Sequence, residues 1–555
     1  MSVVTVQLGQ AGNQAGHAML QCMWDHHASQ ASKSDSVHRF FRESKRCGGC
    51  HVARAICVDT ESKVISHINE MQHQAPKSWT YDQARTLFTK RGAGNNWANG
   101  YYNYGRAHVP DIVNMIRLEM EACDLVEGFS ILQSVAGGTG SGLGAAVLDA
   151  LQDEFPHVPS WAKIIWPHET GETVVQSYNC VLSMAHAYQA CDGILLFEND
   201  HLQDICHRML RLKRVTVQDL NKVIAQQLVA ALSCTREASL DDFSQMSPVN
   251  SSFGQVLREA CPHPDYKLLR LRLVPQMPPT YQAFTRYEWA PLLKTASAML
   301  NAGAHLEEGF HRARPLQNAA RSATGTTRAL VTAATGTVAA HAATADLTSQ
   351  TPLYPHPPAE PPFLAPPPEA LVQGRHGTED NTSTAIARGG NACVSQLYFC
   401  HGTDLASGAL RDVGTTTATP KVFASRSNDR TRIAGNGKAV ALLSNEKALA
   451  HPLRVTSSCL SVKSPAAKTP QLAAHHNTIK PNHTTRPQDY YYSHKRARTH
   501  ARPRKRPQRA VSHKAWRLYR HRAFLHQYSA YGLGAEDLHQ HFLALQQVVR
   551  SYQSL

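Results

Sequence analysis

The sequence predicts an α/β protein that begins with a doubly wound parallel sheet, continues into an α+β segment and ends in helices, with two disordered insertions. Three observations lead to this fold class. Strand-like apolar runs alternate with amphipathic, helix-like runs through about the first 230 residues. Glycine-rich turns join strands to helices, as they do where a ligand binds at the carboxyl edge of such a sheet. Beyond Pro248, strands and helices follow one another without this alternation.

The strands of the first part are short apolar runs that end at polar or glycine-containing turns. We predict them at residues 3–8, 52–58, 129–135, 163–167 and 194–197. A helix at residues 143–155 follows the third of them, because its apolar residues recur at helical spacing. Another helix, with a wide apolar face, begins at Gln218.

The later part combines strand and helix patterns. Strand-like runs lie at residues 267–274, 281–289, 394–400 and 440–444, and a helix-like run lies at 290–300. Residues 516–555 carry apolar side chains at helical spacing, so we expect a helical tail there.

Two segments differ in composition from the rest and are predicted to be disordered. Ala, Thr and Pro dominate residues 312–391, which we interpret as an expanded surface loop, with a proline-rich docking site as the alternative. Residues 458–512 hold twelve Lys and Arg against one acid, and so carry most of the net charge of +15. Three interpretations of this basic segment stay open: a nuclear import signal, a patch for an acidic polymer surface, or drift.

The composition argues against several classes of protein. Because the positive charge lies in one segment, we do not expect the folded part to bind nucleic acid. No run approaches the roughly 18 apolar residues of a membrane span, and the first residues lack a basic stretch followed by an apolar core. Thirteen cysteines with irregular spacing fit reduced thiols better than a disulfide framework. We therefore expect a soluble intracellular protein without membrane association.

The turn at residues 136–144 reads Ala-Gly-Gly-Thr-Gly-Ser-Gly-Leu-Gly and joins a predicted strand to a predicted helix. Such a turn lets backbone N–H groups approach a phosphate at the positive end of a helix dipole. It lacks the lysine of a Walker loop, so the phosphate charge must be met by backbone donors, the hydroxyls of Thr139 and Ser141, and a cation. The alternative is a flexible Gly/Ser turn, which the flanking strand and helix disfavour.

Two further glycine turns, at residues 9–14 and 92–98, occur in the same half of the chain. The strand at 52–58 ends in Asp59-Thr60-Glu61, and carboxylates at the end of a strand are well placed to hold magnesium through water. A solvated loop acid or a helix N-cap is the alternative for each of them. A third acid, Glu169, follows the strand at 163–167.

These blocks together resemble the tubulin family. The resemblance is carried by residues 9–14 (GQAGNQ), 92–97 (GAGNNW), 137–142 (GGTGSG) and 522–526 (RAFLH), in this order, and it covers all but the two insertions. Within the family the chain is most similar to the delta-tubulins, through residues 164–167 (IIWP), 197–200 (FEND) and 262–264 (PHP). The resemblance implies a protein that binds GTP or GDP with Mg²⁺.

The resemblance also implies a set of site residues. The nucleotide would be bound by Gln10, Gln14, Ala93, Gly94, Asn95, Ser134, Gly138, Thr139, Gly140, Glu172, Gln176, Asn199 and Asn221. In this set Glu172 and Gln176 match the ribose-side loop, and Asn199 and Asn221 would read the guanine edge through amide hydrogen bonds. Glu61, helped by Asp59, would serve the magnesium ion.

Three positions depart from the family pattern. Ala11 replaces a common cysteine, and Val217 replaces an aromatic residue that stacks on guanine. Gln255 stands where alpha-tubulin carries an acid that activates water against the GTP of the neighbouring subunit. An amide orients water but does not take its proton, so intrinsic GTPase activity is in doubt. Glu259, one helical turn away, is the candidate substitute, and a solvated acid is the alternative.

The resemblance implies a GTP-binding domain (1–217), a connecting core helix (218–237), an intermediate domain (238–457) and C-terminal helices (513–555). The function implied for a delta-type chain is structural: support of triplet microtubules in centrioles and basal bodies, and of cilium assembly. Its partners would be other tubulins of the alpha/beta or epsilon type, microtubules and centriole proteins, in the cytoplasm and cytoskeleton, with nuclear entry open.

Two other functions are weighed. One is a lattice-forming tubulin subunit. The other, from a different class, is a dinucleotide-dependent oxidoreductase, because Gly140-x-Gly142-x-x-Ala145 fits a relaxed dinucleotide fingerprint with Glu169 as the ribose-binding acid.

Overall fold

The computed structural model of the protein describes most of the chain outside the two insertions. The described residues are 2–28, 35–44, 50–74, 79–171, 173–233, 236–238, 246–250, 252–282, 287–308, 392–402, 421–426, 438–446, 449 and 511–555. All of them belong to one compact unit, residues 1–311 and 390–555. The insertion predicted at 312–391 lies outside the described residues, and so does that at 458–512 except for its last two residues.

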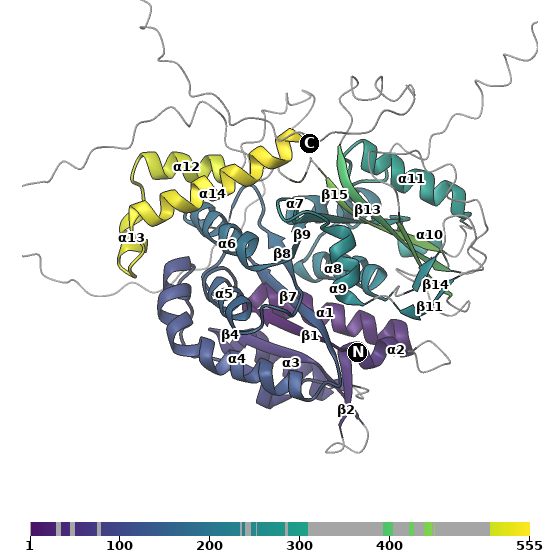
Figure 1. Cartoon of the computed structure of the whole chain (residues 1–555), viewed down its shortest axis with the longest axis horizontal. Helices are drawn as coiled ribbons and strands as arrows, with labels where there is room; N and C mark the ends of the chain where they lie inside the picture. The colour runs from purple at the N-terminus through teal and green to yellow at the C-terminus, as the bar shows by residue number, and fades with distance from the viewer. Residues whose placement is uncertain are drawn as a thin grey trace, which may run out of the picture. The chain divides into compact units, whose positions relative to one another are not determined.

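One long mixed sheet runs through the described part of the chain (Figure 1). Its strand order is β11-β10-β14-β13-β15-β12-β9-β8-β7-β1-β4-β6. The parallel strands are β1 (Ser2–Leu8), β4 (Ala55–Asp59), β6 (Thr86–Phe88), β7 (Val126–Ser134), β8 (Ser160–Trp166) and β9 (Gly193–Glu198). From β1 the chain adds β4 and β6 on one side and β7, β8 and β9 on the other. The order therefore reverses between β1 and β7, which is where ligands bind in doubly wound sheets.

The sheet continues into the later part of the chain. Its strands there are β12 (Leu268–Val274), β13 (Cys393–Gly402), β14 (Lys421–Arg426), β15 (Ala439–Glu446), β10 (Arg236–Ala238) and β11 (Met246–Asn250). Strand β12 pairs in parallel with β9 and antiparallel with β15, so it joins the parallel part to the mixed part. The predicted doubly wound sheet, followed by a mixed α+β part, is confirmed.

Helices cover both faces of the sheet. Their bounds are α1 (Gly9–Ala28), α2 (Asp35–Phe40), α3 (Ser62–Gln74), α4 (Gly105–Glu121), α5 (Gly144–Glu154), α6 (Gln176–Ala190), α7 (Asn199–Asp204), α8 (Val217–Leu232), α9 (Phe253–Ala260), α10 (Pro279–Gln282), α11 (Trp289–Asn301), α12 (Val511–Arg520), α13 (Leu525–Ser529) and α14 (Ala535–Ser554). Short helices of other kinds are η2 (Gln83–Arg85), η3 (Asn99–Tyr104), η4 (Thr139–Leu143) and η5 (Ile205–Met209).

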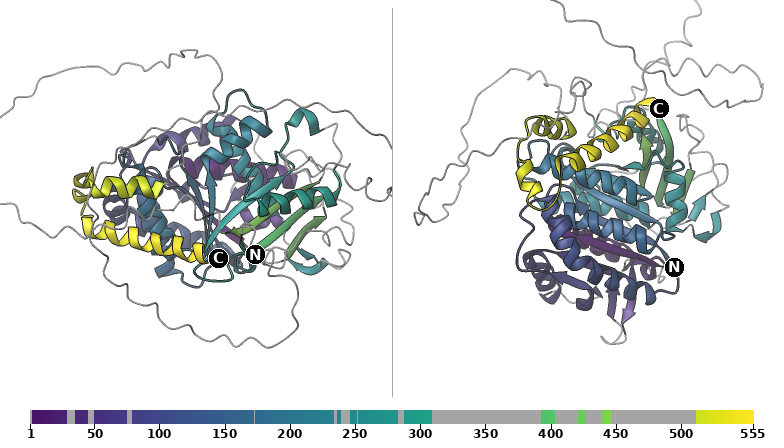
Figure 2. Two further views of the ribbon diagram at one scale, coloured as in Figure 1. Left: turned by 90° about the horizontal axis from the view of Figure 1, so that it is seen from above. Right: turned by 60° about the vertical axis from the view of Figure 1, so that its left-hand side comes forward.

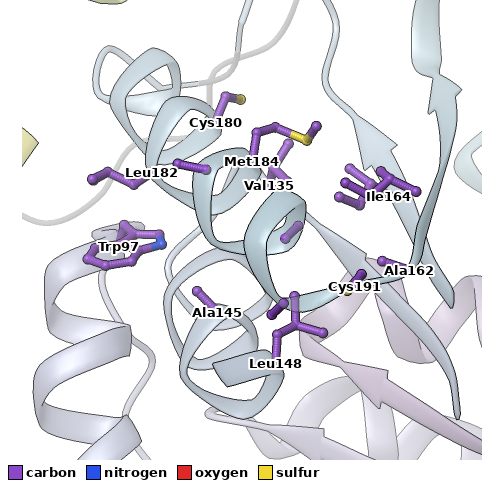
Figure 3. Packing of buried hydrophobic residues seen from close by; sticks show 14 of the residues in the cluster. Trp97, Val135, Ala145, Leu148, Ala162, Ile164, Cys180, Leu182, Met184 and Cys191 are labelled. Carbon is purple, nitrogen blue, oxygen red and sulfur yellow. The ribbon is translucent and has the colours of Figure 1, made fainter. Parts of the chain in front are cut away.

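Alternation along β1 divides its side chains between two clusters, one on each face of the sheet, and a third cluster packs α11 against β12, β13 and β15. On β1, Val4 and Val6 join a cluster with α4, α5, α6 and α14, whereas Val3 joins a cluster with α1, α3, α8 and α9. Figure 3 shows part of the first cluster, in which Leu148 of α5 and Met184 of α6 pack over the sheet. The predicted helical tail is confirmed, and α12 and α14 lie against α6 (Figure 2).

Two predicted strands are wrong in detail. Residues 52–58 form not one strand but parts of two, because the chain changes sheet at Arg54. Strand β3 (Cys50–Ala53) pairs with β2 (Phe41–Ser44) and β5 (Trp79–Thr80) in a separate small sheet, whereas β4 pairs with β1. At the crossing, the Arg54 N–H donates to Phe40 O and the Arg54 carbonyl accepts from Thr5 N.

The second wrong prediction is the strand at residues 281–289. Where this stretch is described, residues 281–282 end α10, residues 287–288 form neither helix nor strand, and Trp289 begins α11. Pro279 occupies the first position of α10, where a missing N–H costs nothing and the fixed φ suits a helix. Among the described residues, no helix is both long and apolar enough to cross a bilayer.

A buried histidine forms a hydrogen bond between the mixed part of the sheet and helix α8. His401 of β13 is 2% exposed, and its Nε2 lies 2.6 Å from Ala230 O of α8, which makes Nε2–H the donor. Burial lowers the pKa of His401 to about 3, and that of the adjacent His26 to about 4. Both groups are therefore neutral in the folded chain at pH values where they are charged in the unfolded chain.

We expect this burial to make stability fall as the pH decreases. The contribution is complete above the unfolded histidine pKa of about 6.5 and is lost progressively below it. For His401 alone the loss between pH 7.5 and pH 5.0 is about 2 kcal/mol. Urea unfolding at the two pH values measures it. His401→Gln keeps an N–H donor but does not titrate, so its pH dependence should be smaller by this amount, whereas His521→Gln, at an exposed position, should behave as the parent chain.

Candidate nucleotide-binding site

Three glycine turns meet at the reversal point of the sheet. The turn after β1 contacts the turn after β7, because a Cβ on Gly9 would lie 2.8 Å from Gly140 N. The turn at 92–98 contacts the same segment, because a Cβ on Gly138 would lie 2.8 Å from both the Ala93 Cβ and Asn96 N. Real Cβ atoms essentially never approach so closely, so these positions require glycine. The phosphate-binding turn predicted at residues 136–144 is thus part of a cradle that is built from these three segments.

A pair of threonine hydroxyls links the turns to the acidic strand end. Thr60 follows β4, and its Oγ1 lies 2.5 Å from Thr139 Oγ1 in η4. Thr60 Oγ1 also accepts from Ala93 N at 3.2 Å. Sequence reasoning assigned no role to Thr60, although it stands between the two acids that were predicted to serve a metal. The bonds place that strand end beside the cradle.

The two acids differ in environment. Asp59 is buried, its Oδ1 accepts from Glu61 N at 3.3 Å, and its Oδ2 has no hydrogen-bond partner. Burial raises the pKa of Asp59 to about 6. The Glu61 side chain is exposed and lies against Gly92. Asn13 of α1 donates to Gly9 O and Val58 O, and its Oδ1 also lacks a partner.

These unsatisfied oxygens fit a hydrated magnesium ion. Mg²⁺ keeps several of its waters and is held by one or two carboxylates together with substrate phosphates. Among the described residues, no group of three or more His, Cys, Asp or Glu converges as a closed metal site. Asp59 and Glu61 supply two carboxylates beside the cradle, which is the number that such an ion needs.

A buried asparagine that the sequence did not identify holds two of the turns together. Asn179 of α6 is fully buried, and its Nδ2 donates to Asn95 O at 2.9 Å and to Ala136 O at 2.8 Å. Its Oδ1 accepts from Trp97 N at 3.0 Å and from the Tyr528 hydroxyl of α13 at 2.7 Å. One amide therefore satisfies four groups from three segments. No short motif signals it, because its partners are distant in sequence.

The remaining predicted phosphate-side residues lie on the same segments. Gln10 is exposed and Gln14 half-buried in the first turns of α1, which packs against η4. Ser134 ends β7, and its hydroxyl accepts from Ala136 N. Gly94 and Asn95 adopt left-handed backbone conformations, with φ of 63° and 52°. The structure thus brings this part of the predicted set to one edge of the sheet.

The predicted base-side residues lie on two adjoining helices. Asn199 is the first residue of α7, directly after β9, and Asn221 lies buried on α8, which contacts α7. Glu198, just before Asn199, is held by Arg270 and His201. Burial alone would raise the pKa of Glu198, but the His201 and Arg270 contacts lower it to about 2. Val217, where a stacking aromatic was expected, is 56% exposed.

The loop after β8 is hydrogen-bonded to the start of α7. His168 Nδ1 lies 2.8 Å from Asp200 Oδ1, and Glu169 N donates to Asp200 Oδ2 at 2.9 Å. Gln176 begins α6, and its amide donates to His168 O at 3.3 Å. Glu172, predicted for the ribose side, lies outside the described residues.

Gln255 and Glu259 are not part of this site. Both lie on α9, whose first N–H, from Phe253, donates to Glu127 Oε2 at 2.7 Å. Glu127 is near the start of β7, whereas the cradle follows its end. At about 3.3 Å per residue, the strand separates them by roughly 20 Å. Neither side chain therefore reaches the predicted cradle of its own chain.

The comparisons with known proteins agree with this geometry. Residues 2–207 match the model of the tubulin/FtsZ family GTPase domain, which implies binding of GTP or GDP rather than a dinucleotide. The chain is 40% identical over 324 residues to the human tubulin delta chain, covering 56% of this chain and 70% of that protein. It is 40% identical over 321 residues to the mouse tubulin delta chain, covering 56% of this chain and 69% of that protein. The chain therefore belongs to the tubulin family, as a GTP-binding cytoskeletal protein that is most like the delta chains.

Proposed function

We propose that this chain is a magnesium-dependent guanine-nucleotide-binding tubulin of centrioles and basal bodies, where it supports triplet microtubules and cilium assembly. One observation supports the nucleotide site: three glycine turns meet where the strand order of the sheet reverses. The similarity to delta chains of human and mouse supports the centriolar role. The proposal includes a GTP-binding domain (1–217), a connecting core helix (218–237), an intermediate domain (238–457) and C-terminal helices (513–555).

In this site, backbone N–H groups of residues 138–140 would bind the phosphates, with Ala93, Gly94 and Asn95 at the terminal one. Glu61 and Asp59 would hold Mg²⁺, which neutralises phosphate charge when bound. Asn199 and Asn221 would bind guanine, whose edge offers both donors and acceptors. Gln10, Gln14 and Ser134 would complete the phosphate side, and Glu172 and Gln176 the ribose side.

The proposed partners are other tubulins of the alpha/beta or epsilon type, microtubules and centriole proteins. The proposed location is the cytoplasm and cytoskeleton, and the basic segment at 458–512 leaves nuclear entry open. The position of α9 at the sheet edge opposite the nucleotide supports head-to-tail association, because Gln255 could meet only the nucleotide of another subunit.

Bound nucleotide is the first test. The full chain is purified with magnesium, denatured, and the released ligand chromatographed. GTP or GDP is expected, and recovery of NAD would overturn the proposal in favour of an oxidoreductase.

Glu61→Gln, at an exposed position, should retain the fold and lose the dependence of GTP affinity on magnesium. Sedimentation with GTP tests the alternative of a lattice-forming subunit, because such a subunit would assemble and pellet in the absence of other tubulins. Loss of triplet microtubules after depletion in centriole-bearing cells tests the cellular role.

The position of α9 leads to a prediction for Gln255→Glu. Restoring a carboxylate should leave GTP turnover in the isolated chain unchanged within about twofold, because a residue roughly 20 Å from its own cradle activates no water there. Hydrolysis is followed by chromatography at two protein concentrations, with Gln540→Glu on the exposed face of α14 as the control. A large increase that does not depend on protein concentration would contradict the placement of α9.

A further inference from the structure

Two histidines from distant parts of the chain face each other beside the 92–98 turn. His186 lies on α6 and His541 on α14, and their Nε2 atoms are 3.1 Å apart. The ring centroids are 5.0 Å apart, with 26° between the ring planes. The rings thus meet through their Nε2 ends and form a polar contact between these two helices.

The other nitrogen of each ring already has an acceptor. His186 Nδ1 lies 2.8 Å from Asp149 Oδ2 on α5, a carboxylate that also accepts from the Tyr101 hydroxyl at 2.7 Å. His541 Nδ1 lies 2.6 Å from Asp537 O, a backbone carbonyl. An ionised carboxylate and a carbonyl only accept, so both Nδ1 atoms carry the hydrogen. In the neutral rings, both Nε2 atoms then present lone pairs.

Two lone pairs at 3.1 Å repel each other unless a cation lies between them. A shared proton or a metal ion could supply this cation. The Nε2–Nε2 distance fits a metal ion, because two imidazole nitrogens bound to one tetrahedral ion at about 2.0–2.1 Å stand roughly 3.3 Å apart.

We propose that His186 and His541 bind a transition-metal ion of the zinc class. Imidazole nitrogen suits zinc, copper and nickel, whereas magnesium and calcium prefer oxygen. Both histidines donate their second N–H to oxygen acceptors, which is the usual support of metal-bound imidazole. With two protein ligands, water would complete the coordination, and the 13% and 30% exposure of the His186 and Asp149 side chains leaves a route from solvent.

Such an ion would link the C-terminal helix α14 to α6 of the predicted nucleotide-binding domain. The His186 ring centroid lies 5.1 Å from that of Trp97, which belongs to the 92–98 turn that is predicted to face the terminal phosphate. Zinc would thus stabilise the packing of α14 on α6 next to the nucleotide loop. This site is separate from the proposed magnesium site and does not depend on nucleotide binding.

Chemical modification tests the site within the full chain. Diethyl pyrocarbonate at pH 7.5 modifies free imidazole nitrogen, and peptide mass spectrometry locates it. With magnesium in excess and increasing zinc, His186 and His541 should become protected together, whereas His539 on the same helix should stay reactive. Asp149→Asn should raise the zinc concentration for half-protection by about 10–100-fold, because it weakens the support of His186. His186→Gln should remove the zinc-dependent protection of His541.

Zinc titration followed by thermal unfolding provides the second measurement. Zinc should raise the Tm of the parent chain and of His539→Gln, but not that of His541→Gln. Magnesium alone should protect neither histidine. Equal reactivity of His541 and His539 at every zinc concentration would overturn the proposal. Protection of His541 that appears without zinc below pH 6 and is unaffected by zinc at pH 7.5 would also overturn it, and would assign a shared proton instead.

Discussion

Replacing Asn179 with Ala is expected to lower the free energy of unfolding by roughly 3–6 kcal/mol and to remove most of the nucleotide affinity. The substitution leaves two carbonyl oxygens and a backbone N–H without their partner in a fully buried place. The Tyr528 hydroxyl also loses Asn179 but keeps Val175 O as an acceptor at 3.3 Å. Each unsatisfied buried group costs about 1–3 kcal/mol. Because those carbonyls belong to Asn95 and Ala136, the two turns that line the cradle would separate.

Urea unfolding and nucleotide retention measure the two effects. Asn179→Asp keeps the acceptor for Trp97 N and for the Tyr528 hydroxyl but removes both donors, so we expect a large loss of affinity from it as well. Asn103→Ala is the control, because this exposed amide contacts Asn99 within a single helix and should change stability by at most about 0.5 kcal/mol. A stable Asn179→Ala chain that retains full nucleotide would show that Asn179 does not organise the turns.

The second large effect is expected at Glu446. This carboxylate of β15 is fully buried and binds two arginines of β12, with Arg270 Nη1 at 2.9 Å and Arg272 Nη2 at 2.7 Å. Glu446→Gln removes the charge and leaves Arg272, itself 1% exposed, in a buried position without its carboxylate. Breaking a buried ion pair on one side costs about 3–5 kcal/mol.

Denaturant unfolding of Glu446→Gln checks this value. Glu308→Gln is the matched control, because Glu308 pairs with Arg208 on the surface, with side chains 54% and 51% exposed. Surface pairs contribute about 0–1 kcal/mol, so the control should unfold nearly as the parent chain does. Equal losses in the two variants would mean that the β12–β15 cluster contributes no more than a solvated pair.

Local sequence patterns were sufficient where one segment carries the whole signal. Short apolar runs located β1 and β7, because both faces of these strands are buried. Helical spacing located α5, α8 and α14, because the buried face of a helix repeats along its own residues. The three glycine turns were also visible in sequence, since close backbone contact excludes side chains wherever it occurs. The break at Arg54 was not visible, because what divides β3 from β4 is the pairing of each with a different sheet.

The candidate site likewise has features that the sequence shows and features that only the fold decides. Glycines, acids and asparagines at the ends of strands pointed to a phosphate-binding edge and, through the resemblance, to guanine nucleotide. Contacts between residues far apart in the chain could come only from the folded structure. Asn179 joins α6 to two turns and to α13, Glu446 joins β15 to β12, and His541 meets His186 across more than 350 positions. Hydrogen bonds and ion pairs act over about 3 Å in space whatever the separation in sequence, so no pattern along the chain records them.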